Sequence, residues 1–267
     1  VMQERKEKIR KPVSSDFIKR KTEGKKIAAL SLYDALFAKF AYLAGIDLLL
    51  VGDSLGMTVL GMDNTLSVKL EDILRHASAV RRGAPYAYIV ADMPFMTYQS
   101  SISDAMKNAA KFIQDASCDA VKIEGGKMAV PTIESLVSAG IPVMAHIGLL
   151  PQKILILGGY RKIGKTIEEK EELIEDAKAV EKAGAFSVIL ECVEEELAAN
   201  ITEVLKIPTI GIGSGKNCDG QIQVAHDILG MNDDFIPKHA KKYINLSEEV
   251  KKVFSIYCKE VLENSFL

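Results

Sequence analysis

The sequence predicts a (β/α)8 barrel, also called a TIM barrel, and three observations carry that prediction. Short apolar runs, which are typical of strands buried on both faces, alternate with stretches of helical periodicity. Four of the helical stretches end at a glycine that is followed at once by a strand, as in αβ connections. Seven clear strands, with an eighth expected within residues 222–236, fit a barrel better than an open sheet. No linker is visible, so we expect a single domain over residues 1–267.

The chain opens with a charged stretch, residues 1–26, which we expect to form a solvated N-terminal helical arm. It carries ten Lys or Arg side chains against four Asp or Glu. One short helix is predicted over residues 15–23, with Ser14 or Ser15 as its N-cap and Gly24 as its stop.

The remaining elements follow in regular alternation. The clear strands are expected to begin near residues 27, 47, 87, 119, 142, 186 and 208. Helices are predicted over residues 34–44, 70–82, 103–116, 132–139, 167–183 and 194–205, and a closing helix over 247–262. In the 34–44 helix the apolar residues form one broad stripe, made of Leu36, Phe37, Phe40, Ala41 and Leu43.

Composition narrows the class of protein. The chain has 34 Lys and Arg against 36 Asp and Glu, so no strong field favours nucleic acid or a membrane surface as the main partner. No apolar run is long enough to span a bilayer, and no apolar secretory segment is visible. Four widely spaced cysteines are expected to be buried free thiols in a reducing compartment: Cys118, Cys192, Cys218 and Cys258. We therefore expect a cytoplasmic protein.

Polar groups follow five of the predicted strands at the point where each strand ends. Residues 48–51 lead to Asp53 and Ser54, and the next strands end at Asp92, Glu124, His146 and Glu191. The carboxyl ends of parallel strands lie on one face of the sheet, where α/β proteins build their sites. These side chains are therefore expected to meet in one site.

The three consecutive acidic strand ends, Asp53, Asp92 and Glu124, predict a metal site. Three oxygen ligands without a cysteine suit a hard cation such as Mg²⁺, and other divalent cations are possible. The alternative is that each acid simply caps the following helix or faces water.

Two further features of these strand ends point to chemistry. Lys122 and Glu124 lie two residues apart, so they share one strand face, and a buried lysine needs an anionic partner. A substrate carboxylate could supply one, or the two could form a purely structural pair. Glu191 is the most isolated carboxylate and the candidate general base, whereas His146 is a weaker candidate.

Two loops also attract attention. Residues 211–215, Gly-Ile-Gly-Ser-Gly, resemble a phosphate-binding loop, although these glycines could serve only a tight turn. The loop over residues 148–165 is too long for an ordinary connection after a strand, and is a candidate lid.

Several motifs in order make the chain resemble the ketopantoate hydroxymethyltransferase family over nearly its whole length. The motifs are Tyr33-Asp34, Val51-Gly-Asp-Ser-Leu-Gly-Met57, Asp92-Met-Pro-Phe95 with Tyr98, Val121-Lys-Ile-Glu-Gly-Gly126, His146-Ile-Gly-Leu149 with Pro151-Gln152, Gly158-Gly-Tyr160, Ile189-Leu-Glu191, Gly211-Ile-Gly213 and Asp219-Gly-Gln221. The family fold is a (β/α)8 barrel, in agreement with the strand count.

This resemblance implies transfer of a one-carbon unit from 5,10-methylenetetrahydrofolate to 3-methyl-2-oxobutanoate, giving 2-dehydropantoate, in the first step of pantothenate biosynthesis. It also implies a homo-oligomer, a decamer in the family. The implied roles are metal binding by Asp53, Asp92 and Glu124, oxoacid binding by Asp53, Ser54, Asp92 and Lys122, and proton abstraction by Glu191. We add His146 to the substrate-binding candidates.

The departures from the family pattern avoid the metal and base positions. Ser214 stands where Ala is usual, Glu194 where Pro is usual and His239 where Phe is common. Two alternative functions are a metal-dependent lyase of small 2-oxo or 2-hydroxy acids and a non-catalytic scaffold. Such lyases usually carry a catalytic cysteine in a Lys-Cys-Gly-His type of loop, which this sequence lacks.

Overall fold

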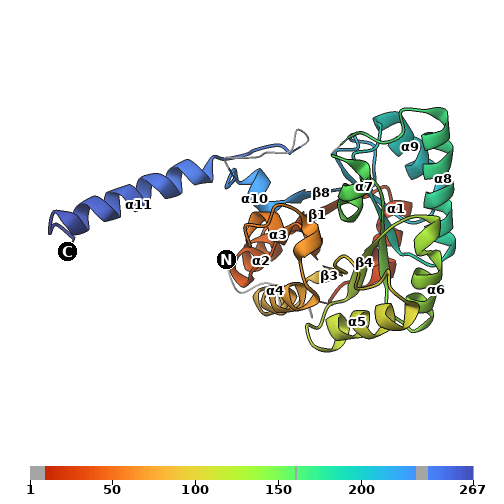
Figure 1. Ribbon diagram of the computed structural model, residues 1–267, viewed down its shortest axis with the longest axis horizontal. Coiled ribbons are helices and arrows are strands. Elements are labelled where there is room, and N and C mark those ends of the chain that lie inside the picture. Colours follow the sequence, from red (N-terminus) through yellow and green to blue (C-terminus); the bar gives the residue numbers. More distant parts are fainter. Residues whose placement is uncertain (1–9, 160, 233–239, 267) are drawn as a thin grey trace. The chain divides into compact units, whose positions relative to one another are not determined.

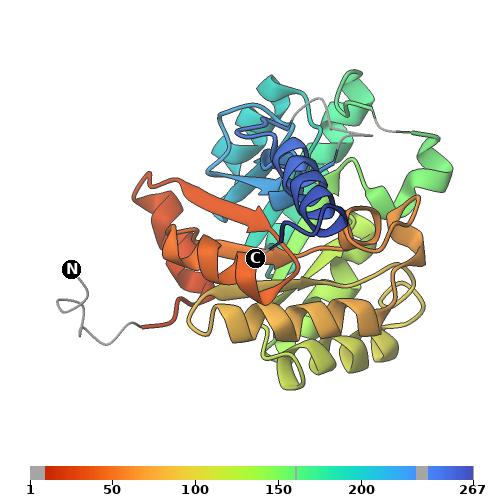
Figure 2. The same ribbon diagram turned by 90° about the vertical axis from the view of Figure 1, so that its left-hand side faces the viewer.

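A closed barrel of eight parallel strands forms the centre of the fold, as predicted. The computed structural model describes residues 10–159, 161–232 and 240–266. The strands follow one another around the barrel in chain order, and Figure 1 and Figure 2 show helices outside them. The strands are β1 (Ile27–Ser31), β2 (Leu48–Val51), β3 (Tyr88–Asp92), β4 (Ala120–Glu124), β5 (Val143–Gly148), β6 (Ser187–Glu191), β7 (Thr209–Ile212) and β8 (Gly220–Val224).

The predicted helices are all present, with ends shifted by one or two residues. They are α1 (Ser14–Thr22), α2 (Ala35–Leu43), α4 (Leu70–Gly83), α5 (Ile102–Gln114), α6 (Val130–Ser138), α8 (Ile167–Lys182), α9 (Glu195–Val204) and α11 (Leu246–Leu262). Short elements not predicted from the sequence lie mostly in the loops after strands: α3 (Leu55–Thr58), η1 (Thr65–Ser67), η2 (Lys127–Ala129), η3 (Pro151–Lys153), α7 (Ile154–Leu157) and α10 (Ala225–Ile228).

Two boundary details differ from the prediction. The N-cap of α1 is Val13, whose N–H donates to the Asp16 side chain, so neither Ser14 nor Ser15 caps this helix. The eighth strand begins at Gly220, two residues before the predicted range, which extends to residues 233–236 outside the described part of the chain. The Gly-rich turn that precedes β8 hid its start from the periodicity.

The interior of the barrel changes from apolar to polar along each strand. Neighbouring strands pair Asp92 with Lys122 and Glu124 with His146. Side chains two residues apart share a face, so the positions that precede these four on the same face belong to the apolar core. That core contains Val90, Ala120 and Met144, among others. The register therefore predicts that the carboxyl end of the barrel, which we call the mouth, is polar above an apolar interior.

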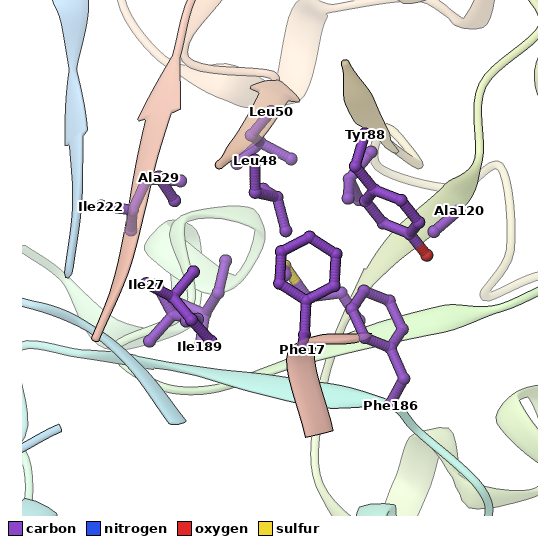
Figure 3. Packing of buried hydrophobic residues seen from close by; sticks show 13 residues of the cluster. Phe17, Ile27, Ala29, Leu48, Leu50, Tyr88, Ala120, Phe186, Ile189 and Ile222 are labelled. Carbon is purple, nitrogen blue, oxygen red and sulfur yellow. The ribbon is translucent and has the colours of Figure 1, made fainter. Parts of the chain in front are cut away.

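The other end of this core includes helix α1. Phe17 is only 3% exposed and packs its ring edge-on against Tyr88, with centroids 4.9 Å apart, and beside Phe186 at 6.1 Å. Figure 3 shows Phe17 among the core side chains of the strands. Lys21 fixes the helix further through an ion pair with Asp219 at 2.7 Å. The prediction of a solvated arm is therefore wrong for residues 14–22, and residues 1–9 lie outside the described chain.

Helix α2 faces the opposite way from the usual apolar stripe. It buries Ala38 and Ala41, while Leu36, Phe40 and Leu43 are 60%, 52% and 72% exposed. The reason is the close approach of α2 to α4, because a Cβ on Gly83 would lie 2.0 Å from the carbonyl oxygen of Ala35. Only small side chains fit that contact, so the large ones point outward.

The chain divides into two compact units at Ile222, within β8, and the structure does not place them relative to one another. The second unit contains α10 and α11, and no residue of α11 is buried. The single domain and the closing role of α11 therefore stay predictions. No helix within the described ranges is long and apolar enough to cross a membrane. All four cysteines are free, but Cys192 is half-buried and Cys258 exposed, so burial was wrong for those two.

The aromatic contact at the base of the barrel yields a stability prediction. Phe17→Ala should lower the free energy of unfolding by about 3–5 kcal/mol, the usual cost of deleting a buried aromatic ring. Urea unfolding followed by circular dichroism measures this. Tyr86→Ala is the control, since Tyr86 is 52% exposed, and it should cost little. Equal losses in the two variants would show that α1 does not belong to the core.

Candidate active site

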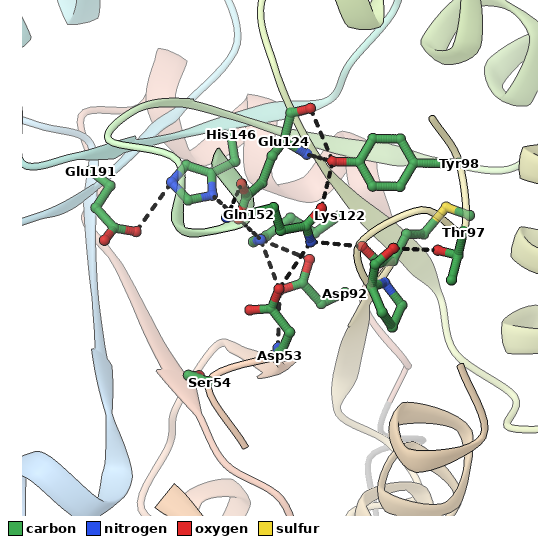
Figure 4. A network of polar contacts seen from close by, with 12 residues as sticks. Asp53, Ser54, Asp92, Thr97, Tyr98, Lys122, Glu124, His146, Gln152 and Glu191 are labelled. Carbon is green, nitrogen blue, oxygen red and sulfur yellow. Dashed lines mark hydrogen bonds and ion pairs between the residues drawn. The ribbon is translucent and has the colours of Figure 1, made fainter. Parts of the chain in front are cut away.

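The mouth of the barrel brings together six of the seven side chains that the sequence predicts for the site. Asp53, Asp92, Lys122, Glu124 and His146 are all buried, and Glu191 keeps 14% of its side chain exposed. Figure 4 shows them converging from successive strand ends. The seventh, Ser54, stands outside this network, because its Oγ hydrogen-bonds the Tyr33 hydroxyl at 2.8 Å.

Lys122 is the only cation among these side chains. Its Nζ donates to both oxygens of Asp92, at 2.7 and 2.8 Å, and lies 3.7 Å from Glu124 Oε1. Burial alone would lower the pKa of Lys122, but the charges of Asp92, Glu124 and Asp53 outweigh it and raise that pKa. The lysine is therefore fully charged near neutral pH.

One lysine does not balance three carboxylates. If Asp53, Asp92 and Glu124 were all ionised, their charge of −3 and the +1 of Lys122 would leave −2 in a buried site. Burial and the charge of Asp92 accordingly raise the pKa of Asp53 to about 8. Burial raises the pKa of Glu124 well above its usual value, and its buried Oε1 makes no hydrogen bond.

This surplus of negative charge fits a divalent cation, since oxygen ligands of this kind suit Mg²⁺. The carboxylates are nevertheless not preassembled around a metal. Across residues 10–159, 161–232 and 240–266, no three His, Cys, Asp or Glu side chains are grouped as ligands. Lys122 and the Gln152 side chain contact two of the carboxylates instead, Asp92 and Asp53 respectively. A cation that joins the three acids would require these side chains to shift.

His146 stands between Glu191 and Glu124. Its Nε2 lies 3.2 Å from Glu191 Oε2, and its Nδ1 lies 3.7 Å from Glu124 Oε1. Burial, reinforced by the charge of Lys122, lowers the pKa of His146, so its ring is neutral near pH 7. Glu191 is thus held apart from the three-acid cluster by a neutral imidazole.

The backbone around Glu191 is held by a serine that the sequence marked only as a departure. Ser214 is fully buried; its Oγ donates to the Leu190 carbonyl at 2.7 Å and accepts from the Val193 N–H at 2.9 Å. Between them, Cys192 has a φ of 50°, a left-handed conformation that costs a non-glycine residue about 1–3 kcal/mol. Ser214 therefore clamps a strained turn directly after the candidate base.

The two loops that the sequence singled out have different roles from each other. Gly211–Gly215 makes a turn into β8, and its only hydroxyl, on Ser214, is engaged by the backbone, which favours the tight-turn alternative. The 148–165 loop contains the short helices η3 and α7, and Ile163 forms a bridge with Val193. Tyr160 lies outside the described residues.

Sequence reasoning missed two contributors to the network. Tyr98 and Gln152 were quoted as motif residues without a role, yet both are buried, and the Tyr98 hydroxyl donates to Gln152 Oε1 at 3.0 Å. Their position in loops after β3 and β5 was the only available signal. A neutral side chain in a loop gives no pattern that predicts burial.

Comparison with known proteins follows from this geometry. A family model described as ketopantoate hydroxymethyltransferase matches residues 11–266. A relative from Carboxydothermus hydrogenoformans, named 3-methyl-2-oxobutanoate hydroxymethyltransferase, is 51% identical over 246 residues, covering 92% of this chain and 89% of its own. A relative of the same name from Thermotoga maritima is 52% identical over 248 residues, covering 92% of each.

Solved structures of other enzymes share the fold at much lower identity. Phosphonopyruvate hydrolase in complex with oxalate and Mg²⁺ superposes with a TM-score of 0.62 at 12% identity, covering 95% of this chain and 88% of that one. A 2,3-dimethylmalate lyase gives a TM-score of 0.60 at 16% identity, covering 94% and 88%. At such identities the likeness shows the barrel fold alone.

The serine clamp yields a second prediction. Ser214→Ala should lower the free energy of unfolding by about 1–3 kcal/mol, because it leaves the buried Val193 N–H without its acceptor. Thermal and chemical unfolding measure this. Ser135→Ala removes a hydroxyl that bonds Pro131 on an exposed helix, and should change stability by much less. A Ser214→Ala variant as stable as the parent would refute the clamp.

Proposed function

Because the chain belongs to the ketopantoate hydroxymethyltransferase family, we propose that the mouth of its barrel is the active site for hydroxymethyl transfer to 3-methyl-2-oxobutanoate. The product is 2-dehydropantoate, formed in pantothenate biosynthesis. One observation carries the placement of the site: three buried carboxylates share one lysine, and a fourth carboxylate stands apart beside a neutral histidine.

The substrate sets three requirements for the site. The oxoacid carries a carboxylate that must be neutralised, the 2-oxo group must be polarised, and the proton on C3 must be removed. Asp53, Asp92 and Glu124 are the side chains that would hold Mg²⁺ or another divalent cation. When bound, that cation would supply Lewis acidity toward the oxoacid oxygens and so favour loss of the C3 proton.

Lys122 is placed to neutralise the substrate. Its ammonium is buried at the mouth and is already ion-paired with Asp92. An oxoacid that enters this site brings a further negative charge, to which Lys122 can donate a charge-assisted hydrogen bond worth about 1.5–3 kcal/mol. Asp53, Ser54 and His146 complete the proposed oxoacid-binding set.

Glu191 is the proposed general base. It is the only carboxylate of the site outside the cluster around Lys122, and it keeps some contact with solvent. The neutral His146 ring beside it can orient the carboxylate without adding a competing positive charge. Removal of the C3 proton by Glu191 leaves a carbon nucleophile, which attacks the one-carbon unit of 5,10-methylenetetrahydrofolate, the proposed donor.

Assembly and location are part of the same proposal. Helix α2 exposes Leu36, Phe40 and Leu43, and α11 exposes a separate apolar set that includes Phe254 and Tyr257. Exposed apolar patches of this kind are typical of protein interfaces. They support a homo-oligomer, which we propose to be a decamer as in the family, acting in the cytoplasm.

Exchange of the C3 proton of 3-methyl-2-oxobutanoate in heavy water tests the role of Glu191, because this step needs no folate. Glu191→Gln should lower the exchange rate by about 10²–10⁴-fold, the usual contribution of a positioned acid–base group. Nuclear magnetic resonance of the substrate measures the rate, and calorimetry should show that oxoacid binding persists.

Glu203→Gln, the same change on the exposed face of α9, is the matched control and should exchange at the parent rate. Parent-like exchange in Glu191→Gln would remove Glu191 from proton abstraction. The loss of exchange in both variants would point to a general defect instead.

A further inference from the structure

Gln152 occupies a position that the proposed mechanism does not yet use. It lies in η3, directly after Pro151, in the long loop that follows β5. Although it belongs to a loop, its side chain is buried, with only 4% of the residue exposed. A buried amide must satisfy its hydrogen bonds locally, so its partners indicate what it does.

The side-chain amide of Gln152 makes all four of the hydrogen bonds available to it. Its Nε2 donates to Asp53 Oδ2 and to the Met93 carbonyl, both at 2.9 Å. Its Oε1 accepts from the Tyr98 hydroxyl at 3.0 Å and from Gln99 Nε2 at 2.9 Å. This saturation fixes the orientation of the amide, as Figure 4 shows.

The backbone of the same residue reaches a second carboxylate. The Gln152 N–H donates to Glu124 Oε2 at 3.1 Å, and the Tyr98 hydroxyl accepts from the Glu124 N–H at 3.1 Å. One loop residue thus contacts acids that come from two strands that are not adjacent, β2 and β4. Without it, two buried carboxylates that repel each other would have no common donor.

We propose that Gln152 is a positioning residue, which holds the Asp53 and Glu124 carboxylates at the mouth so that one divalent cation can bridge them. This inference rests on the proposed function, in which these acids bind the cation. Outer-shell partners of this kind orient ligands, and their loss typically weakens metal affinity about 10–100-fold.

The same contacts couple the loop to the cation. Gln152 is followed at once by α7, whose Leu155 and Ile156 are 79% and 86% exposed, so few other contacts fasten this part of the loop. Coupling between two sites is reciprocal. If Gln152 favours cation binding, the bound cation must in turn favour the docked loop.

Calorimetric titration of Mg²⁺ in the presence of saturating 3-methyl-2-oxobutanoate tests the proposal. Gln152→Met keeps a side chain of similar size but removes its hydrogen bonds, and should raise the Kd for Mg²⁺ by about 10–100-fold. In turnover assays the Mg²⁺ concentration for half-maximal rate should rise, whereas the rate at saturating Mg²⁺ should stay close to that of the parent. A role in folding alone would not produce that split.

Gln114→Met is the matched control, because Gln114 is exposed at the end of α5, and it should bind Mg²⁺ like the parent. An unchanged Kd in a folded Gln152→Met variant would overturn the positioning role while leaving the proposed metal site intact. A parent enzyme that binds no divalent cation would instead refute the metal site itself, and with it this inference.

Hydrogen–deuterium exchange on the parent enzyme provides a test that needs no variant. Mg²⁺ with the oxoacid should slow amide exchange in residues 150–157, by the reciprocity above, and should leave the outer helix α8 unchanged. Identical loop exchange with and without Mg²⁺, under conditions where calorimetry shows that it binds, would overturn the proposal even if Gln152→Met failed to fold.

Discussion

The surplus of buried negative charge at the mouth of the barrel is the constraint on which the rest of the site depends. Asp53, Asp92 and Glu124 share a single lysine, and buried carboxylates at this density take up protons unless a cation balances them. Each neighbouring feature responds to this charge. Lys122 ion-pairs with Asp92, Gln152 donates to the other two acids, and the histidine beside them stays neutral.

The barrel creates this charge density through its geometry. Parallel strands place every second side chain inside, and their carboxyl ends meet at one mouth. The apolar interior below, closed at its other end by Phe17, gives the polar layer a base of low polarity, which strengthens each electrostatic interaction above it. Stability and chemistry thus come from successive residues of the same strands.

The barrel and most of the site could be predicted from the sequence because both depend on local signals. Strand ends, terminal glycines and acidic residues in successive units are visible in one dimension. Gln152 was missed because a neutral side chain in a loop has no periodicity, and Phe17 because one aromatic residue within a charged stretch does not indicate burial. The stripe on α2 faces outward since only small residues fit the approach of α4 at Gly83, a contact that no local pattern reveals.

Anomalous diffraction from crystals of the parent enzyme grown with Mn²⁺, a substitute for Mg²⁺ that scatters strongly, tests most directly that the three carboxylates hold a divalent cation. The account predicts one strong peak within ligand distance of at least two of the Asp53, Asp92 and Glu124 carboxylates, and loss of the Gln152 or Lys122 contacts only where the cation replaces them. An intact Lys122–Asp92 pair with no peak at the mouth, or a peak elsewhere on the chain, would contradict it.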